Sequence, residues 1–201
     1  MKLRRTGGAS TGRSHRAFVV AHWEPKEGAT TLALALALRA AELDPSCTLC
    51  VADFDFAHPS LSSLTGLDAM TGLSNVLADQ AGLDQVLAGT PLPNLYVAPA
   101  GNGSIDRQTG PWHDRCRDLC GQLTKRFNYV FLDMPALRDH RDFALGAGGL
   151  AEALLVVRAG QARRQVIAKA IQTLELIRLQ LAAVVLNGRE YYLPRWLYTR
   201  T

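Results

Sequence analysis

A glycine-containing segment that joins an apolar run to a long apolar helix constrains this chain more than any other part of it. The apolar run covers residues 17–21, and the helix is predicted over residues 30–43. A strand, a glycine loop and a helix in this order place backbone N–H groups and the helix N-terminus where the phosphates of a nucleotide can bind. We therefore predict a phosphate-binding loop made of Pro25, Lys26, Glu27, Gly28, Ala29, Thr30 and Thr31.

The end of this loop departs from the usual pattern. Such loops normally end in Gly-Lys-Ser/Thr, in which the lysine reaches the β- and γ-phosphates and the hydroxyl binds Mg²⁺. Here Gly28 and Thr30 are present, but Ala29 stands at the lysine position. Thr30 is the predicted metal ligand of the loop. Lys26 is an alternative source of positive charge, because the long stem of a lysine can reach a ligand from a neighbouring position.

The composition predicts one globular domain. The 201 residues are 48% apolar and 20% charged, with a formal net charge of +4. Residues 1–16 carry basic but no acidic side chains, and we predict that they form a flexible basic arm. A solvated leader is favoured over an anchor for an anionic membrane. The longest apolar run, residues 32–38, is too short to cross a bilayer, and no signal peptide pattern is present. We expect a cytoplasmic, soluble protein.

Four cysteines fit this expectation as buried free thiols. Cys47 and Cys50 fall at the start of a predicted strand, where three-residue spacing directs them to opposite faces. Cys116 and Cys120 are one helical turn apart and are predicted to share a face. A four-cysteine zinc site is the less favoured alternative, since the strand would separate the first pair.

Short apolar runs alternate with helical patterns along the whole chain, which is typical of βαβ units and a parallel sheet. The predicted strands are residues 17–23, 48–55, 95–100, 129–134, 153–158 and 181–187. The predicted helices are residues 30–43, 71–77, 83–87, 112–126, 139–146 and 163–178. This order predicts a single-domain, three-layer α/β/α fold of the P-loop NTPase type over residues 17–188. A polar loop at 101–110 and an aromatic C-terminal tail at 189–201 complete the chain.

Polar residues end three of these strands. Asp53 and Asp55 are predicted to share a face at the end of the second strand, beside the phosphate loop. Two carboxylates placed there suit Mg²⁺, with one of them available as a general base, although a turn that begins with aspartates is the simpler alternative. Asp133 follows four apolar residues, the pattern of a Walker B strand, in which the acid orients the metal. Asn187 ends the last strand, where its amide suits recognition of a base, although turns also favour asparagine.

In this order and spacing, the segments resemble the deviant Walker P-loop ATPases related to MinD and ParA. The resemblance is strongest to the cytoplasmic catalytic domain of bacterial tyrosine autokinases of capsule and exopolysaccharide synthesis, and it extends from residue 17 to residue 188. The family's Pro-Gly-Glu-Gly-Lys-Ser/Thr loop is similar to residues 25–30, and its Asp-x-Asp-x-Arg-x-Pro-Ser-Leu motif is similar to residues 53–61. The other matching segments are residues 72–77, 92–101, 129–135, 155–160 and 185–187.

The resemblance implies ATP and Mg²⁺ as cofactors, with Asp53, Asp55 and Asp133 as catalytic residues and with Thr30, Asp55 and Asp133 around the metal. It also implies a base contact at Asn187. Three departures fall on this chemistry: Lys26 replaces the first glycine of the loop, Ala29 its lysine and Ala57 the arginine of the second motif. Because two cationic groups near the nucleotide are missing, we predict that ATP and Mg²⁺ binding is weakened or lost and that phosphoryl transfer is impaired.

The resulting hypothesis is a degenerate tyrosine kinase-like regulator of exopolysaccharide synthesis and export, recruited to the inner membrane face by an integral membrane polysaccharide chain-length or export protein. Alternatives are an active tyrosine autokinase and a MinD- or ParA-like positioning ATPase, the latter less favoured because Glu24 stands where that group has its signature lysine. Self-association into a homo-oligomer remains open, although we find no Glu-x-x-Arg-x-x-Arg helix before the first strand. Sequence-specific nucleic-acid binding is not predicted. The tail, with Tyr191, Tyr192, Trp196 and Tyr198, is expected to pack or dock rather than to be a phosphorylation cluster.

Overall fold

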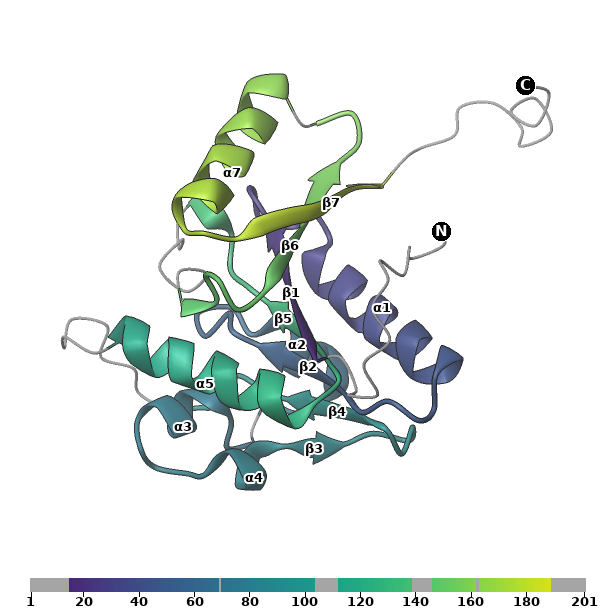
Figure 1. The fold of residues 1–201 in the computed structure, drawn as a ribbon, viewed down its shortest axis with the longest axis vertical. Helices are drawn as coiled ribbons and strands as arrows, with labels where there is room; N and C mark the ends of the chain where they lie inside the picture. The colour runs from purple at the N-terminus through teal and green to yellow at the C-terminus, as the bar shows by residue number, and fades with distance from the viewer. Residues whose placement is uncertain (1–14, 69, 104–111, 139–145, 162, 189–201) are drawn as a thin grey trace.

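A single seven-stranded sheet forms the centre of the protein, with strand order β3-β4-β2-β5-β1-β6-β7 (Figure 1). The computed structural model describes residues 15–68, 70–103, 112–138, 146–161 and 163–188. All neighbouring strands run parallel except β3, which pairs antiparallel with β4. The strands are β1 (Arg16–His22), β2 (Leu49–Asp53), β3 (Ala88–Gly89), β4 (Leu95–Ala98), β5 (Tyr129–Asp133), β6 (Glu152–Arg158) and β7 (Gln180–Asn187).

Helices cover both faces of this sheet. They are α1 (Ala29–Leu43), α2 (Ser60–Thr65), α3 (Leu73–Leu77), α4 (Leu83–Val86), α5 (Trp112–Arg126) and α7 (Arg164–Leu176). Helix α1 lies on one face, while α5 and α7 lie on the other (Figure 1). Three alanines spaced four residues apart, Ala33, Ala37 and Ala41, are buried on the sheet side of α1, and their small side chains let the helix axis approach the strands closely.

The fold prediction is confirmed. Each of the six predicted strands is present, with ends within two residues of the predicted ones. Helix α5 has the predicted bounds, whereas most of the predicted helix at 139–146 lies outside the described residues. Two elements were not predicted: the two-residue edge strand β3 and the short helix α2, whose serine-rich sequence resembles a turn.

The cysteine faces are also as predicted. Cys50 is buried in the cluster on the α5 and α7 side, whereas Cys47 packs against the cluster on the α1 side. Cys116 and Cys120 are both buried on the same side of the sheet, and all four residues are free thiols. Among the described residues, no three His, Cys, Asp or Glu side chains form a group that would hold a metal ion.

The strand register brings the predicted site residues to one edge of the sheet. Asp53 and Asp133 are paired positions at the carboxyl ends of β2 and β5. Arg158 and Asn187 are paired positions at the carboxyl ends of β6 and β7. The loop that follows β1, between these two pairs in the strand order, is the predicted phosphate loop. A parallel sheet therefore gathers residues that lie far apart in sequence around residues 23–30.

Candidate nucleotide-binding site

The loop between β1 and α1 presents unpaired backbone N–H groups. Lys26 and Gly28 both have left-handed backbone conformations, with φ angles of 66° and 92°. Among the described residues, the N–H groups of residues 27–30 have no hydrogen-bond acceptor. Successive N–H groups without partners, followed by a helix N-terminus, form a concave anion-binding surface. The predicted phosphate loop therefore has the backbone arrangement that phosphate binding requires.

Glycine at position 28 is required for two reasons. The φ angle of 92° is strained for a residue that carries a side chain, and a Cβ atom there would lie 2.1 Å from Nδ2 of Asn187. Nδ2 of Asn187 itself donates a hydrogen bond of 2.9 Å to the carbonyl of Glu27. The amide predicted to contact a base is thus engaged with the loop through its nitrogen, which leaves its oxygen as the group open to a ligand.

The start of the loop is held by two buried side chains. The Glu27 carboxylate accepts hydrogen bonds from the backbone N–H groups of Trp23, at 2.9 Å, and Glu24, at 3.1 Å. The ring nitrogens of His22 lie 2.8 Å from the carbonyl oxygen of Glu24 and 3.0 Å from that of Met134. Glu27 therefore shapes the loop from within rather than facing a ligand, and His22 connects the loop to the end of β5. No motif in the sequence predicts this role of His22.

Helix α1 begins at Ala29, the position of the missing lysine. Its side chain is buried in the cluster that α1 forms with the sheet. The next residue, Thr30, uses its hydroxyl in a hydrogen bond to the Asp133 carboxyl group. This contact places the two oxygen donors predicted to serve Mg²⁺ side by side. Carboxylate and hydroxyl oxygens are ligands that Mg²⁺ prefers, so the residues present fit this ion.

Asp133 is almost fully buried, at 2% exposure. Burial, followed by repulsion from Asp53, raises the pKa of Asp133 to about 8, against the opposing effect of the hydrogen bond from Thr30. Without a cation nearby, this carboxyl group is therefore largely protonated at neutral pH. A bound divalent cation would favour the ionised form and reverse this shift.

Asp53 is tied into the protein by several donors. Its carboxylate accepts hydrogen bonds from the Ser62 N–H at 2.9 Å, the Ser62 hydroxyl at 2.8 Å and the Asp55 N–H at 3.1 Å. Burial raises the pKa of Asp53 to about 6, although the hydrogen bonds from Ser62 act to lower it. This carboxylate therefore links the end of β2 to the first turn of α2.

Asp55 differs from Asp53 in its surroundings. Strand β2 ends at Asp53, so Asp55 lies in the following loop rather than on a shared strand face as predicted. Its carboxylate accepts a 3.0 Å hydrogen bond from the N–H of His58 and is partly open to solvent. Ala57, at the position of the missing arginine, is exposed on the same loop.

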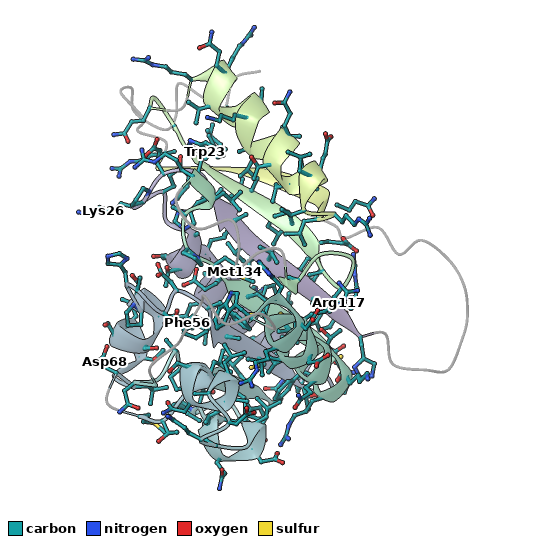
Figure 2. All side chains as sticks on the ribbon, turned by 90° about the vertical axis from the view of Figure 1, so that its left-hand side faces the viewer. Trp23, Lys26, Phe56, Asp68, Arg117 and Met134 are labelled. Carbon is teal, nitrogen blue, oxygen red and sulfur yellow. The ribbon has the colours of Figure 1, made fainter. Side chains whose placement is uncertain are left out.

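Three cationic residues lie in or beside the phosphate loop. Nη1 of Arg158 donates to the carbonyl of Lys26 across 3.3 Å, and Nη1 of Arg138 lies 2.6 Å from the Glu24 carboxylate. The Lys26 side chain extends outward from the loop, away from the protein body (Figure 2). Nothing in the sequence shows that Arg158 and Arg138 reach this loop, so neither was predicted as a site residue.

Comparisons with known proteins find tyrosine kinases among the similar sequences. No family model matches the chain. A tyrosine-protein kinase CpsD from Streptococcus agalactiae serotype III is 24% identical over 183 residues, covering 91% of this chain and 78% of the relative. The tyrosine-protein kinase YwqD from Bacillus subtilis is 23% identical over 186 residues, covering 90% of this chain and 76% of the relative. Over most of its length, the chain is therefore similar in sequence to bacterial tyrosine kinases.

Solved structures of a tyrosine kinase domain and of a MinD protein share the fold of this chain. The kinase domain of Escherichia coli tyrosine kinase ETK superposes with a TM-score of 0.76 at 22% identity, covering 90% of this chain and 72% of that one. The septum site-determining protein MinD from Pyrococcus horikoshii, in complex with Mg-ADP, gives a TM-score of 0.70 at 22% identity and covers 90% and 75% of the two chains. In the described part of the chain, no helix is both long and apolar enough to cross a membrane.

Proposed function

We propose that this protein binds a magnesium nucleotide but transfers phosphate poorly, and that it acts as a kinase-like regulator of a membrane complex for capsule or exopolysaccharide synthesis. The observation that carries the proposal is the loop itself: residues 27–30 keep unpaired N–H groups, yet position 29 is alanine. The backbone part of the binding site is present and its cationic part is reduced.

The backbone groups support nucleotide binding. N–H groups at a helix N-terminus bind phosphate without any charged side chain, and the Thr30 hydroxyl and Asp133 carboxyl group supply oxygen donors for Mg²⁺. Mg²⁺, when bound, would neutralise charge on the phosphates. It would also offset the repulsion among Asp53, Asp55 and Asp133, which otherwise opposes the approach of a γ-phosphate.

The missing cations support poor transfer. Neither Ala29 nor Ala57 can make the charge-assisted hydrogen bonds that a lysine or arginine makes to the transferred group, and such bonds are worth about 1.5–3 kcal/mol each. A cation that acts on the transition state contributes about a thousandfold or more to phosphoryl transfer. Asp53 is also engaged by Ser62 and Asp55, so its role as a general base would require these hydrogen bonds to rearrange.

A role in binding a protein partner would give this nucleotide-binding fold a function that does not require efficient phosphoryl transfer. A nucleotide that binds N–H groups of the loop would also fix the neighbouring surface, and a membrane polysaccharide chain-length or export protein is the partner that the kinase relatives make most reasonable. The partner would bring the protein to the inner face of the membrane. Self-association is an additional proposal for the same surface.

An active kinase is the second candidate, and Lys26 is the observation that favours it. This lysine lies in the loop and is exposed, so its ammonium group can turn toward a ligand. The positioning-ATPase alternative has less support, because Glu24 occupies the signature lysine position and pairs with Arg138.

Calorimetric titration of ATP with and without Mg²⁺, together with a phosphate-release assay, tests the proposal. We expect magnesium-dependent binding without appreciable turnover. Phosphate release that disappears in Lys26→Ala would instead establish an active enzyme that uses Lys26. No binding of ATP or ADP under either condition would overturn the nucleotide-binding proposal and leave a protein-binding role alone.

A further inference from the structure

Two side chains from the neighbouring strands β6 and β7 hold two successive carbonyl groups of the phosphate loop. Arg158, at the end of β6, donates to the carbonyl of Lys26, and Asn187, at the end of β7, donates to the carbonyl of Glu27. We infer that Arg158 and Asn187 are positioning residues that keep the loop in its anion-binding conformation. The inference rests on the proposed nucleotide site, but it concerns how this chain shapes that site without a lysine at position 29.

The planarity of the peptide bond connects these contacts to the ligand side of the loop. In a trans peptide the carbonyl and the following N–H point in opposite directions. When the carbonyl of Lys26 is held on the outer side, the N–H of Glu27 points inward. When the carbonyl of Glu27 is held, the N–H of Gly28 does the same. These two N–H groups have no acceptor among the described residues, which is the state that phosphate binding needs.

The register of the sheet explains why two strands act together. Arg158 and Asn187 are partners in the β6–β7 pairing, so both side chains leave the sheet at the same level. The N–H of Ala159 also donates to the carbonyl of Asn187 at 2.8 Å, which fixes the two strand ends relative to each other. The backbone positions of the two donors are therefore fixed relative to each other.

Close packing makes the arrangement sensitive to small changes. Gly28 approaches the Asn187 amide so closely that no Cβ atom fits between them. Arg158 is exposed, so its contact with Lys26 is not a consequence of burial. In a loop that lacks the lysine at position 29, these contacts add to those of Glu27 and His22 in orienting the N–H groups.

Two substitutions that remove the donors but preserve bulk provide the test: Arg158→Met and Asn187→Leu. Arg39→Met is the matched control, because it removes one exposed arginine from α1 that pairs with Glu42, away from the loop. Titration calorimetry with Mg-ADP should show about tenfold weaker binding for each test variant and no change for the control. Arg158→Lys keeps one charged donor and should restore most of the affinity.

A second measurement separates positioning from simple loss of charge. Inorganic pyrophosphate added to ¹⁵N-labelled protein should shift the backbone amide signals of residues 27–30. In Arg158→Met and Asn187→Leu, the shifts at Glu27 and Gly28 should be lost while those at Ala29 and Thr30 persist. An equal reduction at all four residues would overturn the positioning role.

The outcomes distinguish this inference from the proposed function. Test variants that bind Mg-ADP as tightly as the original protein would overturn the role of Arg158 and Asn187 and leave nucleotide binding intact. An original protein that binds neither Mg-ADP nor pyrophosphate would remove the proposed function and this inference together. Melting temperatures of the variants should stay close to that of Arg39→Met, since both test residues lie at the solvent-facing edge of the sheet.

Discussion

A Cβ atom at Gly28 would lie 2.1 Å from Nδ2 of Asn187, although 158 residues separate the two along the chain. The close approach of Asn187 to Gly28 joins the phosphate loop to the last strand of the sheet. It shows that the loop conformation depends on β7 as well as on its own sequence. The loop therefore remains shaped for phosphate after the loss of its lysine, because the structural constraint on Gly28 does not involve position 29.

Gly28→Ala should abolish nucleotide binding and destabilise the fold. The variant combines a strained φ of 92° with a collision at Asn187, whereas Gly66→Ala has a φ of 71° and open space around the added methyl group. An alanine in the left-handed conformation lowers the free energy of unfolding by about 1–2 kcal/mol. We expect the loss of stability in Gly28→Ala to be larger than that in Gly66→Ala by about 1 kcal/mol. Urea unfolding measures both values. Equal losses of stability in the two variants would show that the Asn187 contact carries no weight.

The stability of the nucleotide-free protein should decrease as pH rises. The pKa of Asp133 is raised from 3.8 in the unfolded chain to about 8 in the folded protein. Between these two pH values the folded state therefore binds more protons than the unfolded state. The contribution of Asp133 to the free energy of unfolding is complete below about pH 4 and is lost progressively as the pH rises to about 8. Asp53, with a pKa raised to about 6, acts in the same direction. Chemical denaturation between pH 5 and about pH 8.5 measures the slope.

Asp133→Asn supplies the control for this pH dependence. The amide cannot ionise, so the decline in stability should be smaller in the variant than in the original protein. Mg²⁺ with ADP should also reduce the decline in the original protein, because a cation favours the ionised carboxylate. Identical slopes in the two proteins would mean that Asp133 does not carry the effect.

The sheet could be predicted because each of its longer strands is a short apolar run between turn signals. The strands of a parallel sheet are covered by helices on both faces, so they require such apolar runs. Helix α2 escaped prediction because its sequence, Ser-Leu-Ser-Ser-Leu-Thr after Pro59, has the composition of a turn. Its first turn is stabilised by the Asp53 carboxylate at the end of β2, which accepts a hydrogen bond from the Ser62 N–H. This contact between separate segments leaves no sign in the local sequence pattern. Strand β3 has only two residues, which is too few to show the two-residue alternation of a strand in the sequence.

The candidate site divides in a similar way. The phosphate loop and the carboxylates near it could be proposed from motifs, since those residues lie in short contiguous segments. His22 and Arg158 could not, because their importance comes from contacts with Met134 and Lys26, each more than 100 residues away. Only the order of strands in the sheet brings these pairs together.

Membrane association should depend on a partner. We expect the protein expressed alone to remain in the soluble fraction and to move to the membrane fraction when an integral membrane polysaccharide chain-length or export protein is co-expressed. Fractionation of cells measures this directly. Salt-sensitive membrane binding of the protein alone, lost on deletion of residues 2–16, would show instead that the basic N-terminal residues are the anchor.

Ala29→Lys should increase the affinity for ATP. The lysine would begin at the first residue of α1, where the N–H groups of the loop converge, and would add a charge-assisted contact to the β- and γ-phosphates. Such a contact corresponds to about ten- to a hundredfold in affinity. Because Ala29 is buried, the new side chain must extend along the loop toward solvent to reach the phosphates. ATP should gain more than ADP, since the γ-phosphate is the group that lacks a cation.

Two further variants make this prediction decisive. Leu43→Lys adds the same charge at an exposed position at the other end of α1, so it should leave ATP affinity unchanged. Lys26→Ala tests the alternative source of charge in the original protein. If the original protein already binds ATP tightly, loses this affinity in Lys26→Ala and gains nothing in Ala29→Lys, then Lys26 is the phosphate ligand. The exposed lysine would then be able to turn inward from the outward position in Figure 2, and the proposal of impaired phosphoryl transfer would have to be abandoned.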